Sequence, residues 1–346
     1  MSISFKGAKR YRKRNGFSAA ARIKRPLPAP VYFYSLRQGG ILLNPIVNVG
    51  DHVLKGQKAA DFDSFDALPI HSAVSGTVTD ISENMISIEN DFLDESVPAS
   101  DFGKANDELT SREMLWIIRE GGICEAASGV PAHILLSPQK TPDRLIVCCF
   151  DSDPYVSSPQ AAALGNTEQI LDGLNIALRI LGIKKASIGV ENDTRKIFSD
   201  FKYRLRYNTD IELYSLKARY PQSRADKLVR TLTGRGIEDA NCAVISSETL
   251  LNISELFRTK MPVTKKIVTV SGDDILLPNN YRVPIGMPIS ALLSDAGYTE
   301  PQTVIRGGVI DGGQVTDLDT PIDNHTSAVI AFNDNGNIPR YRKELI

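Results

Sequence analysis

Cysteine, tryptophan and long apolar runs are all scarce in this chain of 346 residues. Its four cysteines are too few and too irregularly spaced for the disulfide framework of a small secreted protein. No apolar stretch approaches the roughly 20 residues that a membrane-spanning helix needs, and no signal-peptide core follows Met1. These absences predict a cytosolic protein, and 42% hydrophobic with 23% charged residues predicts ordinary globular domains.

The cysteine and histidine positions also argue against metal centres. A ferredoxin-type cluster needs four thiolates, commonly as Cys-x2-Cys-x2-Cys followed by Cys-Pro. None of the four cysteines has such spacing and none follows Cys242, so we expect no 4Fe-4S cluster. At least one of Cys148 and Cys149 is interpreted as a buried strand residue. The isolated histidines are interpreted as surface or hydrogen-bonded residues rather than zinc ligands: His52, His71, His133 and His325.

Acidic residues are absent from the first fifty positions, which carry ten lysines and arginines although the net charge of the chain is -1. Residues 1–25 are therefore expected to form a basic N-terminal arm. Twelve acids lie between Asp61 and Thr110, so the arm could match them internally. It could instead contact an acidic protein or an anionic membrane surface, or act as an organelle transit peptide. Nucleic acid is disfavoured as a partner, because Tyr11 and Phe17 are too few aromatics for base stacking.

Residues 26–100 are predicted to form an all-β module of short strands and tight turns. Two half-motifs, Val49–Gln57 and His71–Val78, each combine a glycine turn with valines. The pair resembles the halves of a barrel-sandwich hybrid, the fold of lipoyl and biotinyl carrier domains. In those carriers the hairpin between the halves displays a modified lysine. The segment Asp61–Pro69 has no lysine, so we expect a structural module rather than a carrier.

Helical and strand patterns alternate over residues 101–265, which predicts a doubly wound, mainly parallel α/β domain of Rossmann-like type. Ser111 and Thr167 are expected to cap two of its helices. The other expected elements are helices at 225–233 and 248–259 and strands at 145–149, 186–190, 211–216, 243–246 and 267–271. Residues 266–335 suggest a β-grasp-like module. Its expected elements are a short helix at 289–296, a glycine-rich hairpin near 306–313 and a last strand at 327–332. Residues 336–346 would be a tail.

Several short blocks in this order resemble the C subunit of the Rnf ion-translocating electron-transport complex. They are Phe5-Lys6-Gly7, the two half-motifs, Tyr220-Pro221-Gln222, Leu232-Thr233-Gly234-Arg235, Val283-Pro284-Ile285-Gly286 and Leu318-Asp319-Thr320-Pro321. The resemblance implies a central domain similar to the complex I flavoprotein subunit and a C-terminal soluble-ligand-binding β-grasp (SLBB-like) domain. It also implies a peripheral subunit on the cytoplasmic side that works with other Rnf-type subunits through flavin, NADH and iron–sulfur clusters.

The family's flavin loop is altered in this chain. Glycines there let the backbone approach the cofactor and offer its N–H groups to phosphate. Cys124, Ala126 and Ala127 stand where the family has glycine, Leu135 replaces a lysine, and Glu125 adds a negative charge. If the crevice still binds FMN, NADH or another small molecule, the expected lining comprises Gly121, Gly129, His133, Asp151, Asp153 and Glu191.

Three functions remain open from the sequence. The leading one is an Rnf-type subunit that acts as a scaffold or adaptor while its partners hold the cofactors. The second is an FMN- or NADH-dependent oxidoreductase subunit with an altered site. The third is a protein that binds or senses a small molecule without redox change. No P-loop, nucleophile elbow or serine-triad pattern suggests another catalytic class.

Overall fold

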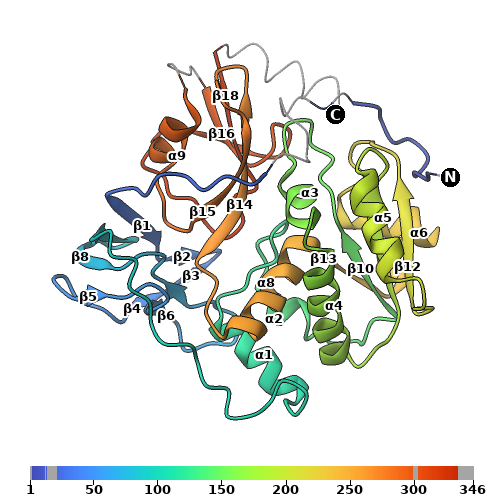
Figure 1. Ribbon diagram of the computed structural model, residues 1–346, viewed down its shortest axis with the longest axis horizontal. Coiled ribbons are helices and arrows are strands. Elements are labelled where there is room, and N and C mark those ends of the chain that lie inside the picture. The colour runs from blue at the N-terminus through green and yellow to red at the C-terminus, as the bar shows by residue number, and fades with distance from the viewer. Residues whose placement is uncertain (1, 12, 14–21, 299–302, 334–346) are drawn as a thin grey trace.

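The computed structural model describes residues 2–11, 13, 22–298 and 303–333 (Figure 1). The expected tail, residues 336–346, lies outside these ranges, as do Arg12 and Arg14 of the basic arm. The described chain forms β-sheets at the N- and C-terminal ends and a parallel α/β region between them. Among the described residues, no helix is long and apolar enough to cross a membrane.

The N-terminal β module contains a four-stranded sheet of order β1-β9-β8-β5 and smaller sheets of β4, β6 and β7 and of β2 and β3. Its strands are β1 (Val31–Ser35), β2 (Arg37–Gln38), β3 (Ile41–Leu42), β4 (Asn44–Pro45), β5 (His52–Val53), β6 (Lys58–Asp61), β7 (Ile70–His71), β8 (Gly76–Ile81) and β9 (Met85–Asn90). Gly76 must be glycine, because a Cβ there would lie 1.9 Å from the Glu89 carbonyl oxygen. The glycine of the second half-motif thus lets β8 lie close to β9.

The central region is built on a parallel sheet of order β12-β11-β10-β13. Its strands are β10 (Arg144–Cys148), β11 (Ala186–Glu191), β12 (Ile211–Leu216) and β13 (Cys242–Ser246). Its helices are α1 (Ser111–Glu120), α2 (Ala132–Leu135), α3 (Ser158–Ala163), α4 (Thr167–Leu181), α5 (Arg195–Arg204), α6 (Ala225–Thr233), α7 (Ile237–Ala240) and α8 (Ser247–Thr259). Leu145 and Val147 face one apolar core, whereas Ile146 and Cys148 face another. Both faces of the sheet are therefore covered, as a doubly wound sheet requires.

The expected caps of two helices were each wrong by one residue. Thr110, rather than Ser111, caps α1 through a reciprocal capping box with Glu113. Asn166, rather than Thr167, is the N-cap position of α4. Cys148, the last residue of β10, is buried, and so is Cys149 directly after it, which confirms the prediction that at least one of them is a buried strand residue.

The C-terminal sheet has the mixed order β15-β14-β18-β16-β17, with β14 and β18 parallel and the other pairs antiparallel. The elements are β14 (Lys265–Gly272), β15 (Asn279–Pro284), α9 (Ile289–Ala296), β16 (Thr303–Arg306), β17 (Gly313–Val315) and β18 (Ala328–Phe332). The strand expected at 267–271 therefore belongs to this sheet and not to the central one.

The two β regions share one apolar core although they lie at opposite ends of the sequence. Tyr32 and Tyr34 of β1 belong to the same buried cluster as Val268 and Tyr281. The backbone N–H of Phe33 donates to the Gly286 carbonyl at 2.8 Å. Figure 1 shows β1 beside the C-terminal sheet. Burial of this shared surface holds the N- and C-terminal parts together.

Candidate functional site

Three of the expected site residues lie together at the carboxyl end of the parallel sheet. Asp151 and Asp153 follow β10, and Glu191 is the last residue of the neighbouring strand β11. Ligands commonly bind at this edge of such sheets. Burial is the main cause of the raised pKa of each of the three carboxyl groups, and the pKa of Asp153 rises to about 7.

The N-terminal arm reaches into this acidic group. Tyr11 Oη donates to Glu191 Oε1 at 3.0 Å, and Lys13 Nζ forms ion pairs with Glu191 and with Asp193, the latter at 3.0 Å. Backbone hydrogen bonds position the arm. The Lys9 N–H donates to the Tyr220 carbonyl at 2.9 Å, and the Tyr220 N–H donates to the Lys9 carbonyl at 3.0 Å. Lys13, in the described part of the arm, thus pairs with Glu191 and Asp193 of the central region. It does not pair with the acids between residues 61 and 110.

Asp153 holds a turn of the C-terminal sheet. Its Oδ1 accepts from the Tyr155 N–H at 2.9 Å, and its Oδ2 accepts from the Ile310 N–H at 3.0 Å. The Gly308 backbone lies so close that a Cβ there would be 2.5 Å from Asp153 Oδ2. Oδ2 therefore joins the central region to the C-terminal sheet, while Oδ1 closes a local turn.

Gly121, Gly129 and His133 lie elsewhere. Gly121 ends α1 against Leu256, and Gly129 has a φ of +75° and lies beside His325. The buried His133 donates from Nε2 to the Phe65 carbonyl, and its ring packs edge-on against that of Phe65 at 4.5 Å. His133 therefore fixes the segment 61–69 of the β module. The six expected residues do not form one crevice.

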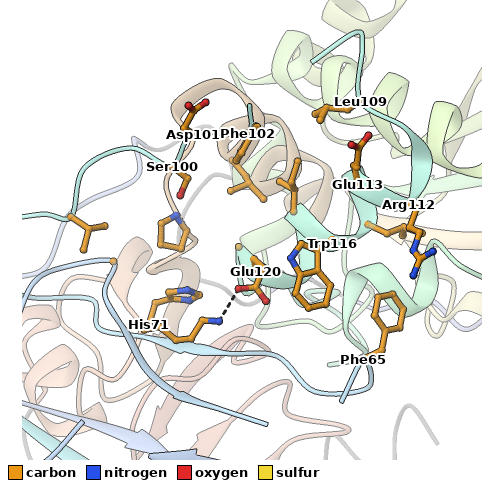
Figure 2. A pocket seen from close by; sticks show the side chains of 18 residues that line it. Phe65, His71, Ser100, Asp101, Phe102, Leu109, Arg112, Glu113, Trp116 and Glu120 are labelled. Carbon is orange, nitrogen blue, oxygen red and sulfur yellow. Dashed lines mark hydrogen bonds and ion pairs between the residues drawn. The ribbon is translucent and has the colours of Figure 1, made fainter. Parts of the chain in front are cut away.

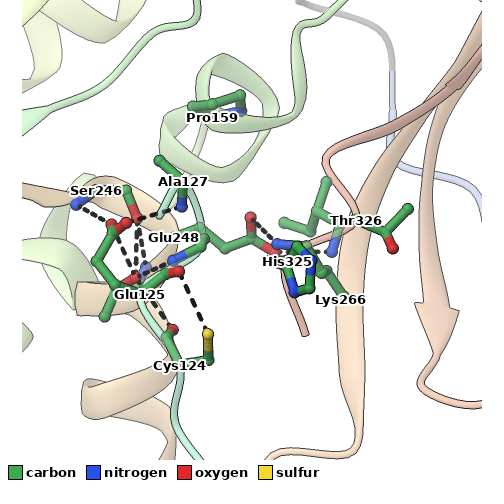
Figure 3. A network of polar contacts seen from close by, with 12 residues as sticks. Cys124, Glu125, Ala127, Pro159, Ser246, Glu248, Lys266, His325 and Thr326 are labelled. Carbon is green, nitrogen blue, oxygen red and sulfur yellow. Dashed lines mark hydrogen bonds and ion pairs between the residues drawn. The ribbon is translucent and has the colours of Figure 1, made fainter. Parts of the chain in front are cut away.

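Glu125 forms a polar centre that the sequence indicates only in part (Figure 3). Its Oε2 accepts from the N–H groups of Ala127 and Ser128, both at 2.8 Å, and its Oε1 accepts from the Ser246 N–H at 2.8 Å. Ser246 is the N-cap of α8, so the carboxylate also lies at the positive end of a helix dipole. Successive N–H groups beside a helix N-terminus form a typical anion site. Here the protein's own carboxylate occupies it.

A buried ion pair continues this network towards the C-terminal sheet. Lys266 Nζ lies 3.2 Å from Glu248 Oε2, while Glu248 Oε1 accepts from the Ile267 N–H at 2.8 Å. Figure 3 shows this pair between the Glu125 centre and His325. Burial raises the pKa of the nearby Cys124 thiol to about 12, so the thiol stays protonated and unreactive at neutral pH.

A separate apolar cavity of about 890 Å³ lies between the N-terminal β module and α1 (Figure 2). We call it the boundary cavity. Its aromatic side chains are Phe65, Phe102 and Trp116, and its polar ones include Lys58, His71 and Glu120. The sequence did not indicate this cavity, because its lining comes from segments as far apart as Gly56 and Pro262. Among the described residues, no group of three or more His, Cys, Asp and Glu side chains is arranged to hold a metal ion.

Comparison with known families agrees with this architecture. Residues 3–97 match the RnfC barrel sandwich hybrid domain, and residues 118–255 match the Nuo51 FMN-binding domain of complex I. The described fold is thus a barrel-sandwich hybrid joined to a Nuo51-like α/β region.

Several relatives match over most of the chain. The C subunit of the proton-translocating ferredoxin:NAD(+) oxidoreductase complex of Clostridium ljungdahlii is 30% identical over 90% of this chain and 72% of its own length. The Na(+)-translocating counterpart of Acetobacterium woodii is 27% identical over 85% of this chain and 71% of its own. The C subunit of the ion-translocating oxidoreductase complex of Haemophilus influenzae is 27% identical, and the match spans only 40% of that protein. The chain belongs to the RnfC family.

A solved structure shows a similar fold at greater distance. An NAD+-reducing [NiFe]-hydrogenase matches with a TM-score of 0.55 and 18% identity, over 68% of this chain and 49% of the hydrogenase chain. At this identity the likeness concerns the fold alone.

Proposed function

We propose that this chain is a structural subunit of an Rnf-type electron-transport complex, which joins partner subunits without holding a flavin in its own altered loop. The observation that carries the proposal is the position of Glu125. Its carboxylate accepts three backbone N–H groups at 2.8 Å, in the loop whose counterpart offers N–H groups to flavin phosphate in the family.

A flavin phosphate does not fit beside this carboxylate. Two anions sharing one set of N–H donors repel each other strongly in a buried site, and Glu125 is 4% exposed. Leu135, which replaces the family's lysine, packs against the apolar core and supplies no counter-charge. We therefore derive no redox step through FMN or NADH at this loop.

The acids at the edge of the sheet have internal partners as well. Tyr11 and Lys13 bind Glu191, and the main chain of residues 155 and 310 binds Asp153. These contacts support a role in holding parts of the chain together rather than in binding a nucleotide.

Docking of the β module supports the scaffold role. Arg119 of α1 pairs with Asp61 at 2.8 Å and donates to the Phe62 carbonyl at 2.8 Å. His133 donates to Phe65 in the same segment. The segment that displays a lysine in carrier domains is here fixed to the central region.

We further propose domain boundaries of 26–100, 101–265 and 266–335, and an SLBB-like β-grasp fold for the last of these. The order β15-β14-β18-β16-β17, with the outer strand pairs antiparallel and β14 parallel to β18, supports that assignment. Lys6, Lys9 and Arg10 of the arm are exposed. They would contact an acidic partner protein or an anionic membrane surface at the cytoplasmic side, with the chain as a peripheral subunit.

Purification of the tagged full-length chain from its own cells tests this function. We expect other electron-transport subunits to copurify, and we expect this chain, once separated from them under native conditions, to lack the visible absorption of bound flavin. Release of one flavin per chain on denaturation would overturn the flavin-free assignment. Recovery of the chain alone from gently solubilised membranes would overturn the adaptor role.

A further inference from the structure

The boundary cavity has the size and wall chemistry of a small-molecule site. Its volume of about 890 Å³ falls in the range of ordinary ligand pockets, roughly 300–1,000 Å³. One wall is formed by α1 and another by strands and loops of the N-terminal β module (Figure 2). It lies away from Asp151, Asp153, Glu191 and Glu125, none of which lines it.

Aromatic surface is available on its walls. Trp116 is 54% exposed and Phe65 is 42% exposed, although large apolar side chains are normally covered. Leu109, Leu115 and Ile117 add aliphatic surface. Such walls favour a flat, apolar ring system, which aromatic side chains contact through their faces and edges.

His71 supplies a polar group with no partner. It is 9% exposed and lines the cavity, and among the described residues neither of its ring nitrogens has a hydrogen bond. This contradicts the expectation that each histidine is either a surface or a hydrogen-bonded residue. A neutral imidazole offers one donor and one acceptor, so the ring of His71 can hydrogen-bond to a molecule in the cavity.

Three of the five charged side chains of the lining, Lys58, Glu113 and Glu120, are paired. Lys58 Nζ pairs with Asp61 and with Glu120, both at 2.7 Å, and Glu113 pairs with Lys104 at 2.6 Å. The other two, Asp101 and Arg112, form no ion pair among the described residues and lie at exposed positions, where water solvates their charges. Within the part of the chain that the structure describes, no unpaired charge lies beside His71, so an uncharged ligand meets the least desolvation penalty.

We infer that the boundary cavity binds an uncharged, planar heteroaromatic molecule of about nucleoside size, whose rings contact Trp116 and Phe65 and whose polar edge hydrogen-bonds to His71. This inference does not depend on the proposed function, because Glu125, whose carboxylate carries that function, does not line the cavity; of the expected flavin-site residues only Gly121 does.

The experiment uses adenosine and guanosine as probes and the full-length chain as it exists. Trp116 is the only tryptophan, so its fluorescence reports on this cavity alone. We expect a saturable change in fluorescence and a rise in melting temperature with at least one probe. His71→Phe, which keeps a flat ring but removes the hydrogen bond, should weaken binding about tenfold. His71→Gln, which retains a donor and an acceptor, should recover part of the affinity.

His52→Gln is the matched control, because His52 lies in the same β module with an exposed side chain paired to Asp91. It should bind as the unmodified protein does. Circular dichroism and the melting temperature without probe establish that each variant is folded. The inference is overturned if neither nucleoside gives a saturable response up to about millimolar concentration, or if a folded His71→Phe variant binds as tightly as the unmodified protein.

Discussion

The Glu125 carboxylate lies at the N-terminus of α8, where its Oε1 accepts the backbone N–H of Ser246 at 2.8 Å. The two residues are 121 positions apart in the chain. Their contact joins the altered flavin loop to the helix that follows β13. The same carboxylate closes the loop on itself through Ala127 and Ser128. The three N–H groups thereby have an acceptor within the protein itself.

Removal of this carboxylate should destabilise the protein. Glu125→Ala leaves three N–H groups in a buried place without an acceptor, and hydrogen bonds to charged groups contribute about 1.5–3 kcal/mol each. We expect a loss of about 2–4 kcal/mol in the free energy of unfolding, measured by urea denaturation. Glu83→Ala is the control, since Glu83 is exposed, and should change that free energy by less than about 0.5 kcal/mol. Equal stability of the two variants would refute the structural role of Glu125.

The junction at Asp153 predicts a contrast between two glycines. A Cβ at Gly308 would lie 2.5 Å from Asp153 Oδ2, whereas a Cβ at Gly313 would meet nothing within 4 Å. The same Asp153 Oδ2 accepts a hydrogen bond from the Ile310 N–H. Gly308→Ala must therefore displace a carboxylate that this hydrogen bond holds in place. It should lower the free energy of unfolding by about 1–3 kcal/mol. Gly313→Ala should be nearly neutral, and a similar loss from both would show that the Asp153 contact does not matter.

The arm should contribute to stability through Lys13. Its ammonium group pairs with Glu191, whose side chain is fully buried. Lys13→Met leaves that carboxylate without its counter-charge, so we expect a loss of about 2 kcal/mol in the free energy of unfolding, less than a fully buried pair would give because Lys13 is 21% exposed. Lys9→Met provides the comparison, because the Lys9 side chain is exposed and should be tolerated. Thermal melts that do not distinguish these variants would contradict the anchoring role.

His71 should make stability fall in mild acid. Burial, followed by the Lys58 charge, lowers its pKa to about 4, against weaker opposing effects of Glu120 and Asp61. The unfolded chain takes up a proton near pH 6.5 whereas the folded chain does so only near pH 4. The His71 contribution to the free energy of unfolding is therefore fully present above pH 6.5 and is lost as the pH falls towards 4. This loss is about 3 kcal/mol at most.

The measurement is the free energy of unfolding of the unmodified protein and of His71→Gln at pH 7 and at pH 4. The unmodified protein should lose about 3 kcal/mol more than the variant over this interval. A pH dependence that is the same with and without His71 would mean that its imidazole is not shielded from water.

Local patterns in the sequence were enough to predict many elements but not the contacts between them. The helices at 225–233 and 289–296 have the predicted bounds, because their apolar residues repeat at helical spacing. Helix α5 was not predicted, since Ile197, Phe198 and Phe201 stand among many charged residues. Asp151, Asp153 and Glu191 were placed together correctly, because parallel strands end at one edge of a sheet.

Long-range partners had no local signal. The sequence showed a negative charge at Glu125 but not its contact with Ser246, which depends on where α8 begins. Tyr11 and Glu191 are 180 residues apart, and nothing in the arm indicates that it returns to β11. His71 was interpreted like the other histidines, because its burial depends on packing between distant segments, such as Gly122 beside its ring.

Titration of the purified full-length protein with FMN, followed by flavin fluorescence and melting temperature together, tests the central claim most directly. If Glu125 occupies the anion site, neither signal should change up to about 1 mM FMN. Glu125→Gly, which removes the competing carboxylate, should bind FMN more tightly than the unmodified protein if it remains folded. Saturable binding by the unmodified protein at roughly micromolar FMN, with a rise in melting temperature, would contradict the account.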